Sequence, residues 1–248
     1  MTASHPHDVI GVLRAPDAVH FGRGALASLA PAVARLGRRA LVVVDPFLAG
    51  TPEFAEALAA LDAAVAGFAA MGHGIEQTAL VPDPGYAPAF RSLWQLSAAR
   101  IPADTPEQEA LLEPLTRWLL HRGRELTGRQ VAEALSTLAA YERSFIRQLA
   151  RFDAVLTPAL ALTPRPVGWY DAVDGERNFA QQVQYTPFTS MVNVTGLPAI
   201  TLPVAQTAAG LPMGVQLIGR PGGEATLLAL GAQLERKLRW QDRVPPGL

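Results

Sequence analysis

The sequence predicts an α/β fold, a sheet flanked by helices, that begins with a Rossmann-like βαβα piece. Two runs near the C-terminus, Ala199–Ala205 and Met213–Ile218, have the length of strands and are almost wholly apolar, which predicts a sheet covered on both faces. Pro203 and Pro212 cannot donate ladder hydrogen bonds, so each is expected at a strand end or on an edge. A third apolar run, Ala40–Asp45, predicts a buried parallel strand.

The N-terminal part alternates strands with helices. Ala18–Phe21 predicts a short strand, and the helix after it opens at Gly22 and ends near Gly37. After the Ala40–Asp45 strand, Thr51 is a helix N-cap that is followed by proline and an acidic residue. This second helix is expected to reach at least residue 61, which completes a β-α-β-α pattern.

A glycine pattern lies at the first of these helices. Gly22, Gly24 and Ala27, followed by Asp45, have the spacing of a dinucleotide-binding motif, in which the glycines admit a pyrophosphate and the acid binds the ribose. An ordinary βαβ unit with a glycine turn explains the same spacing. Residues 9–61 also resemble the start of the iron-containing alcohol dehydrogenases. That resemblance makes Asp45 the cofactor-binding candidate, but the family's phosphate-binding glycine loop and metal cluster have no match here, so no cofactor is expected.

The middle of the chain is mainly helical. It predicts a strand at Ile75–Val81, a helix at Ala87–Ala99, and a helix that begins at the Thr105 cap and includes Leu119. Thr127 opens a further helix through a capping box. That helix carries apolar residues at helical spacing, which are expected to be buried. They are Val131, Leu135, Leu138, Phe145 and Leu149.

The last third begins with a short strand, Asp153–Leu156, and then a long polar segment. Thr163–Gln184 is interpreted as a loop that is either a pocket wall or a solvated surface. The last helix is expected at Glu224–Leu238, where Gly231 allows close approach. The recognition groups of the loop would be Trp169, Tyr170, Asp171, Arg177 and Asn178.

The strings FDAVLTPAL, NVTGLPAITLP and GLPMGVQLIGRPGGEATLLALGAQLE occur in this order between residues 152 and 235. Together they resemble the C-terminal region of the amidase-signature family, over about residues 63–245. The resemblance implies a partial amidase-type mixed sheet, hydrolysis of carbon–nitrogen amide bonds and a small-molecule amide substrate. It also divides the chain into residues 1–61, the dehydrogenase-like piece, and residues 62–248, the amidase region.

That family uses a serine nucleophile, a second serine in a cis peptide and a lysine base, because serine is inert until a base removes its proton. This chain has seven isolated serines and no Ser-Ser pair. Its one lysine, Lys237, lies near a predicted helix end, and arginine does not deprotonate at usable pH. No catalytic residue is therefore assigned, and the chain alone is expected to be inactive.

Three residues are expected to bind substrate because they flank strand ends, where ligands of α/β proteins bind. They are Thr157, Thr189 and Asn193. Asn193 is also expected to be buried and bonded to backbone. No metal site is predicted, since the five histidines show no ligand spacing beyond His5-x-His7.

The bulk composition limits the other function classes. A net charge of −1 argues against nucleic acid as a partner, and the absence of cysteine excludes disulfides and thiolate chemistry. No apolar run approaches the ~18 residues of a membrane span, so a cytoplasmic protein is expected. Two alternatives stay open: an NAD-binding dehydrogenase remnant, and a non-catalytic interaction protein whose exposed core finds a partner chain or a second copy of itself.

Overall fold

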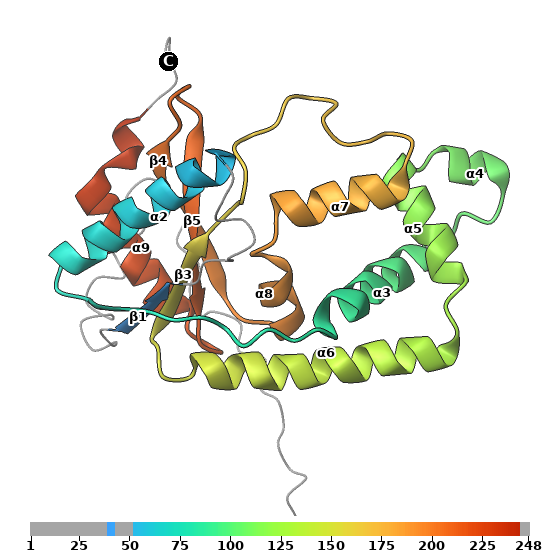
Figure 1. The fold of residues 1–248 in the computed structure, drawn as a ribbon, viewed down its shortest axis with the longest axis horizontal. Coiled ribbons are helices and arrows are strands. Elements are labelled where there is room, and N and C mark those ends of the chain that lie inside the picture. The colour runs from blue at the N-terminus through green and yellow to red at the C-terminus, as the bar shows by residue number, and fades with distance from the viewer. Residues whose placement is uncertain (1–38, 43–51, 244–248) are drawn as a thin grey trace, which may run out of the picture.

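The computed structural model describes residues 39–42 and 52–243, so the predictions that fall on residues 1–38 and 43–51, Asp45 included, lie outside that part. Strands in the described ranges form one sheet in the order β2-β1-β3-β5-β4 (Figure 1). β1 pairs with β2 and with β3 in parallel, whereas β5 is antiparallel to β3 and to β4. The sheet is therefore mixed, as the resemblance implies. The strands are β1 (Arg39–Val42), β2 (Gly74–Gln77), β3 (Ala154–Pro158), β4 (Ala199–Gln206) and β5 (Pro212–Gly219).

The helices fall into two groups around this sheet. α2 and α9 cover one face, and α8 with the C-terminal part of α6 covers the other, while α3, α4, α5 and α7 form a helical lobe beside the sheet (Figure 1). The helices are α2 (Pro52–Ala70), α3 (Tyr86–Ala99), α4 (Pro106–Ala110), α5 (Pro114–Arg124), α6 (Gly128–Leu149), α7 (Gly175–Tyr185), α8 (Ser190–Thr195) and α9 (Glu224–Leu238), and a 3₁₀ turn follows at Trp240–Asp242.

The core follows the two-residue alternation of the strands. Leu156 on β3 and Leu217 on β5 point toward α2 and α9, where they are fully buried beside Leu234. Val155 and Ile218 point the other way, into a second cluster that the end of α6 closes. The central strands thus have apolar neighbours on both faces, which explains their uninterrupted apolar sequence.

β4 departs from the prediction that both C-terminal runs are covered on both faces. It is an edge strand of the described sheet, and its residues alternate between exposed and buried, whereas β5 is buried almost throughout. Pro203 lies on the exposed side, beside the register irregularity between Leu202 and Ala205. A proline is tolerated there because no neighbouring strand needs its missing N–H.

α2 runs without interruption from residue 52 to residue 70 and connects the parallel strands β1 and β2. Phe54 and Phe68, near its two ends, are buried in the same core cluster as Leu217 of β5. The predicted division after residue 61 falls inside this one helix, which packs along its length on the shared sheet.

Two helical predictions need correction. The helix predicted from Thr105 through Leu119 is two helices, α4 and α5, because Pro114 lacks an N–H and disfavours helical backbone in the residue before it. Leu111 falls in the break and is 86% exposed. On α6, Leu135 is 48% exposed because the first half of the helix extends past the sheet, under the lobe (Figure 1).

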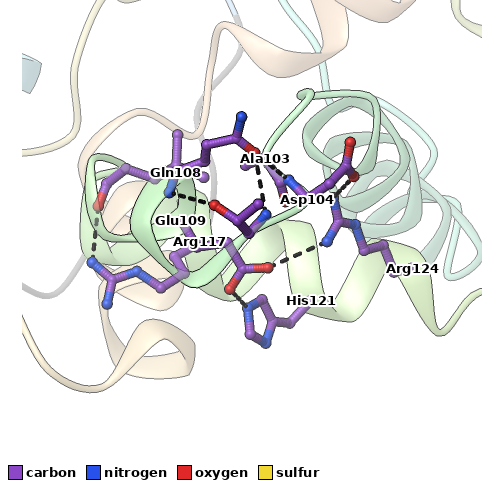
Figure 2. A network of polar contacts seen from close by, with 9 residues as sticks. Ala103, Asp104, Gln108, Glu109, Arg117, His121 and Arg124 are labelled. Carbon is purple, nitrogen blue, oxygen red and sulfur yellow. Dashed lines mark hydrogen bonds and ion pairs between the residues drawn. The ribbon is translucent and has the colours of Figure 1, made fainter.

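Polar contacts fasten α4 to α5 (Figure 2). Glu109 of α4 accepts from Arg124 at 3.2 Å, and its other carboxylate oxygen lies 2.7 Å from Nε2 of His121. Arg124 also donates to the carbonyl of Ala103 at 2.8 Å and to Asp104 at 3.2 Å. A five-residue helix has little stability of its own, so α4 owes its position to these bonds and to its Thr105 capping box.

The close packing of α3 on α5 predicts opposite effects of two glycine-to-alanine changes. A Cβ at Gly123 would overlap the backbone carbonyl of Gln95, whereas a Cβ at Gly128 would have open space around it. We expect Gly123→Ala to lower the free energy of unfolding by about 1–3 kcal/mol through overpacking. Gly128→Ala should change stability by less than about 1 kcal/mol, in the stabilising direction. Urea unfolding measures both, and equal stabilisation by the two changes would contradict the packing described.

Candidate functional site

A cavity of about 700 Å³ lies between α3, α7, α8 and the segment that joins the last two helices. Its walls combine one aromatic side with one polar end. The residues that line it are Tyr86, Ala87, Pro88, Phe90, Arg91, Trp94, Phe179, Ala180, Gln182, Val183, Thr186, Pro187, Thr189, Ser190 and Asn193.

The aromatic side is built by α3. Tyr86, Phe90 and Trp94 follow one another at intervals of four residues, which puts them on one side of the helix. Their rings form a continuous stripe, with centroids 5.8 Å apart for the first pair and 5.7 Å for the second. Phe179 of α7 continues the stripe, 5.7 Å from Trp94. The cavity therefore offers apolar ring surface to whatever it holds.

The polar end is built by α8. Tyr86 donates its phenolic hydrogen to Oγ of Ser190 over 2.8 Å. Asn193 follows Ser190 by three residues and so shares its side of the helix. Its side-chain amide is exposed and has no hydrogen bond with the described residues. The expectation that Asn193 is buried and bonded to backbone is therefore wrong, and its amide is available to a ligand.

Burial sets the protonation of the two tyrosines at this end. Desolvation raises the pKa of Tyr86 to about 12, although the hydrogen bond with Ser190 opposes the rise. Burial also raises the pKa of Tyr141, whose ring lies 4.2 Å from that of Tyr86. Both phenols are protonated at neutral pH, so Tyr86 acts on Ser190 as a donor and cannot accept its proton.

One ion pair stands at the rim. Arg91 of α3 and Glu176 of α7 lie 2.6 Å apart, and both side chains are exposed. The Arg91 guanidinium also lies 4.9 Å from the centroid of Phe179. The pair joins the two helices that face each other across the cavity, and being exposed it contributes little to stability.

The predicted substrate-binding residues divide into two groups. Thr189 and Asn193 line the cavity, whereas Thr157 does not. Thr157 is 1% exposed, and its hydroxyl accepts from Nε2 of Gln216 at 3.2 Å. The same Gln216 amide donates to the carbonyl of Phe188 at 2.8 Å. Thr157 therefore lies behind the cavity wall, where it helps to position the segment before α8 through its hydrogen bond with Gln216.

Sequence reasoning missed the two helices that carry much of the site. α7 occupies the second half of the predicted Thr163–Gln184 loop, and α8 was not predicted. Two local signals mark them: Asp174, whose side chain accepts from the N–H of Arg177, and Gly196, which ends α8 with a φ of 62°. The loop residues Asp171 and Asn178 bond within the loop and α7 and do not line the cavity.

The described residues bring no serine and lysine together. Lys237 is exposed on α9, which packs on the sheet face away from α8. No group of three or more histidine, aspartate or glutamate side chains in the described ranges is arranged to hold a metal ion. Within the same ranges, no helix is both long and apolar enough to cross a bilayer. The cavity supplies apolar surface, neutral hydrogen-bonding groups and, at its rim, the Arg91 guanidinium paired with Glu176.

The pKa of Tyr86 predicts a loss of stability at alkaline pH. Because this pKa rises from 10.0 to about 12 on folding, the unfolded chain releases the phenolic proton first as the pH increases. The folded state then binds more protons, so between pH 10 and pH 12 the free energy of unfolding falls with pH. We expect Tyr86→Phe to lose less stability than the wild type in this window, measured by urea unfolding. Parallel curves for the two proteins would refute the assigned shift.

Comparison with known proteins agrees with the fold. A family model described as Amidase matches residues 8–228, which includes all of residues 9–61, the segment that was expected to resemble dehydrogenases. AmiB2 of Mycobacterium tuberculosis, whose name marks it as a candidate amidase, is 34% identical over 192 residues, 76% of this chain and 40% of the relative. A fatty acid amide hydrolase of Oryza sativa subsp. japonica is 39% identical over 96 residues, 39% of this chain and 16% of the relative.

Among solved structures, a 6-aminohexanoate cyclic dimer hydrolase complexed with substrate superposes with a TM-score of 0.77 and 26% identity. The match covers 98% of this chain and 52% of the hydrolase. The chain thus spans about half the length of that enzyme and 40% of the length of AmiB2. The family match extends over most of the sequence and agrees with the resemblance read from residues 152–235. The chain belongs to the amidase family.

Proposed function

We propose that this chain forms the substrate-pocket half of an enzyme that hydrolyses carbon–nitrogen amide bonds in small molecules. The observation that carries the proposal is the cavity between α3, α7 and α8, which pairs a wall of aromatic rings with neutral hydrogen-bonding groups at Ser190 and Asn193. Such a surface fits a neutral, largely apolar molecule with one polar linkage. Family membership supports the amide as that linkage.

We further propose that the chain does not hydrolyse amides by itself. Attack on an amide carbonyl needs a hydroxyl and a base that takes its proton. The sequence has no Ser-Ser pair, and its only lysine, Lys237, is on the far side of the sheet from Ser190. The nucleophile and base would then come from a segment that this sequence does not contain, held against the pocket as a partner chain.

Mixing experiments test both statements. We expect no turnover of a simple aryl amide by the chain alone, and measurable turnover once the Ser-Ser-Lys half of a related amidase is added. Release of the aryl amine is followed by absorbance, and association of the two halves by light scattering. The added half alone, and that half with an unrelated protein, are the controls. Turnover by this chain alone that Ser190→Ala abolishes would refute the proposal, as would failure of the halves both to associate and to react.

Light scattering also bears on the alternative that the chain is a non-catalytic interaction protein. That hypothesis expects a complex without turnover, or self-association of the chain by itself. A well-behaved monomer that gains activity only in the mixture would contradict it.

The second alternative is an NAD-binding dehydrogenase remnant in residues 1–61. It is supported by the spacing of Gly22, Gly24, Ala27 and Asp45 and by the parallel β1-α2-β2 unit. Against it, the Amidase family model also matches this segment, because the match starts at residue 8. If the remnant binds NAD, calorimetric titration gives heat that Asp45→Ala removes. No heat at millimolar NAD would refute the NAD-binding hypothesis.

A further inference from the structure

We infer that the cavity takes a neutral amide bearing an aryl or alkyl group, with the carbonyl oxygen at Ser190 and Asn193 and the apolar group along the stripe of Tyr86, Phe90 and Trp94. The inference rests on the proposed function and names the substrate class and binding direction for that site. It also assigns Tyr86 as a positioning residue.

The apolar half of the site supports the first part of the inference, that the ligand is neutral and bears an aryl or alkyl group. Trp94 is 38% exposed although it carries a large ring, and its ring lines the cavity. Burying aromatic surface of this kind against a ligand is favourable, since such rings bury a large area at a low entropic cost. Of the described residues that line the cavity, Arg91 is the one with a charge, and it is paired with Glu176 at 2.6 Å. Because Glu176 already compensates the charge of Arg91, no uncompensated charge among these lining residues favours a charged substrate group over a neutral one.

The polar half of the site supports the binding direction, in which the carbonyl oxygen of the ligand lies at Ser190 and Asn193. A serine hydroxyl has one hydrogen to donate and two lone pairs. Because Tyr86 donates to Oγ of Ser190 over 2.8 Å, one lone pair is occupied, and the Ser190 hydrogen has no acceptor among the described residues. The Asn193 amide supplies two further donors on the same side of α8. An amide carbonyl oxygen accepts two hydrogen bonds, so the pair matches it.

Tyr86 is held in place from two sides. Its ring stacks on Phe90 with centroids 5.8 Å apart, and Tyr141 lies 4.2 Å away on another helix, α6. The phenol of Tyr86 is thus fixed by packing, and its hydrogen bond orients the Ser190 hydroxyl. Tyr86 acts on the ligand through Ser190, and its ring also begins the apolar stripe.

Two ligands of matched shape test the inference on the complete chain. N-phenylbutanamide and N-butylaniline share the phenyl group and the four-carbon chain, are both neutral at pH 8, and differ in the carbonyl oxygen. Binding is measured by calorimetry and by quenching of tryptophan fluorescence, with Trp94→Phe to identify the signal from the cavity. We expect the wild type to bind the amide about fivefold more tightly, as one net hydrogen bond implies.

Variants then separate positioning from structure. Tyr86→Phe and Ser190→Ala should each bring the ratio of the two dissociation constants close to one while the amine binds as before. Tyr141→Phe is the matched control, since its ring touches Tyr86 but does not line the cavity, and it should keep the full ratio. Circular dichroism and urea unfolding check that each variant folds. If Tyr86 had only a structural role, Tyr86→Phe would weaken the binding of both ligands equally and leave the ratio of their dissociation constants unchanged.

An unchanged ratio in both variants overturns the inference, as does absence of binding of either ligand by the folded chain at millimolar concentration. The outcome is independent of hydrolysis. Selective binding without turnover in the mixed halves would remove the proposed function and keep the site. Turnover in the mixture without selectivity would remove the inference alone.

Discussion

The position of the cavity depends on one buried amide, that of Gln216. It lies in the middle of β5, a strand otherwise made of apolar side chains and glycine, where an unsatisfied amide would be costly. Its Nε2 donates to the hydroxyl of Thr157 on β3 at 3.2 Å and to the carbonyl of Phe188, in the segment before α8, at 2.8 Å. The ring of Phe188 is anchored separately, in the main core beside Phe54. The sheet thereby fixes the start of α8, and α8 presents Ser190 to the cavity.

The sheet could be predicted from sequence more completely than the lobe. Apolar runs predict β3, β4 and β5, and a glycine-rich helix start predicts α9. These signals are visible in the sequence because the apolar side chains of these elements fill the core. The break between α4 and α5 follows from Pro114. The spacing of the leucines on both sides of this proline led to the prediction of one continuous helix. α7 was read as a loop because it is polar on most of its surface, and its burial comes from distant residues such as Trp118 of α5. Such tertiary contacts leave no local periodicity to detect.

The site was predictable only at one end. Thr189 and Asn193 were chosen because they flank strand ends, where ligands of α/β proteins bind. Both line the cavity, and substrate binding by them stays a prediction. The aromatic stripe was visible as helical spacing of Phe90 and Trp94, but a stripe of this kind is usually core, and nothing in the sequence distinguishes a ring facing a cavity from one facing a neighbour. The Tyr86–Ser190 bond joins residues 104 positions apart. No pattern within a single stretch of sequence can connect them.

The same bond bears on the proposed role of Ser190, which is to hold a substrate and not to attack one. A nucleophilic serine gives its hydrogen to a base, which raises electron density on the oxygen as it attacks. Tyr86 does the reverse: it donates to that oxygen, and with a pKa of about 12 it remains protonated at neutral pH. A hydroxyl that accepts one hydrogen bond is polarised to donate more strongly through its own hydrogen. Ser190 therefore faces a hydrogen-bond donor in Tyr86 and not a base, which strengthens it as a donor to a carbonyl oxygen. Under the proposed function, binding and attack belong to different hydroxyls.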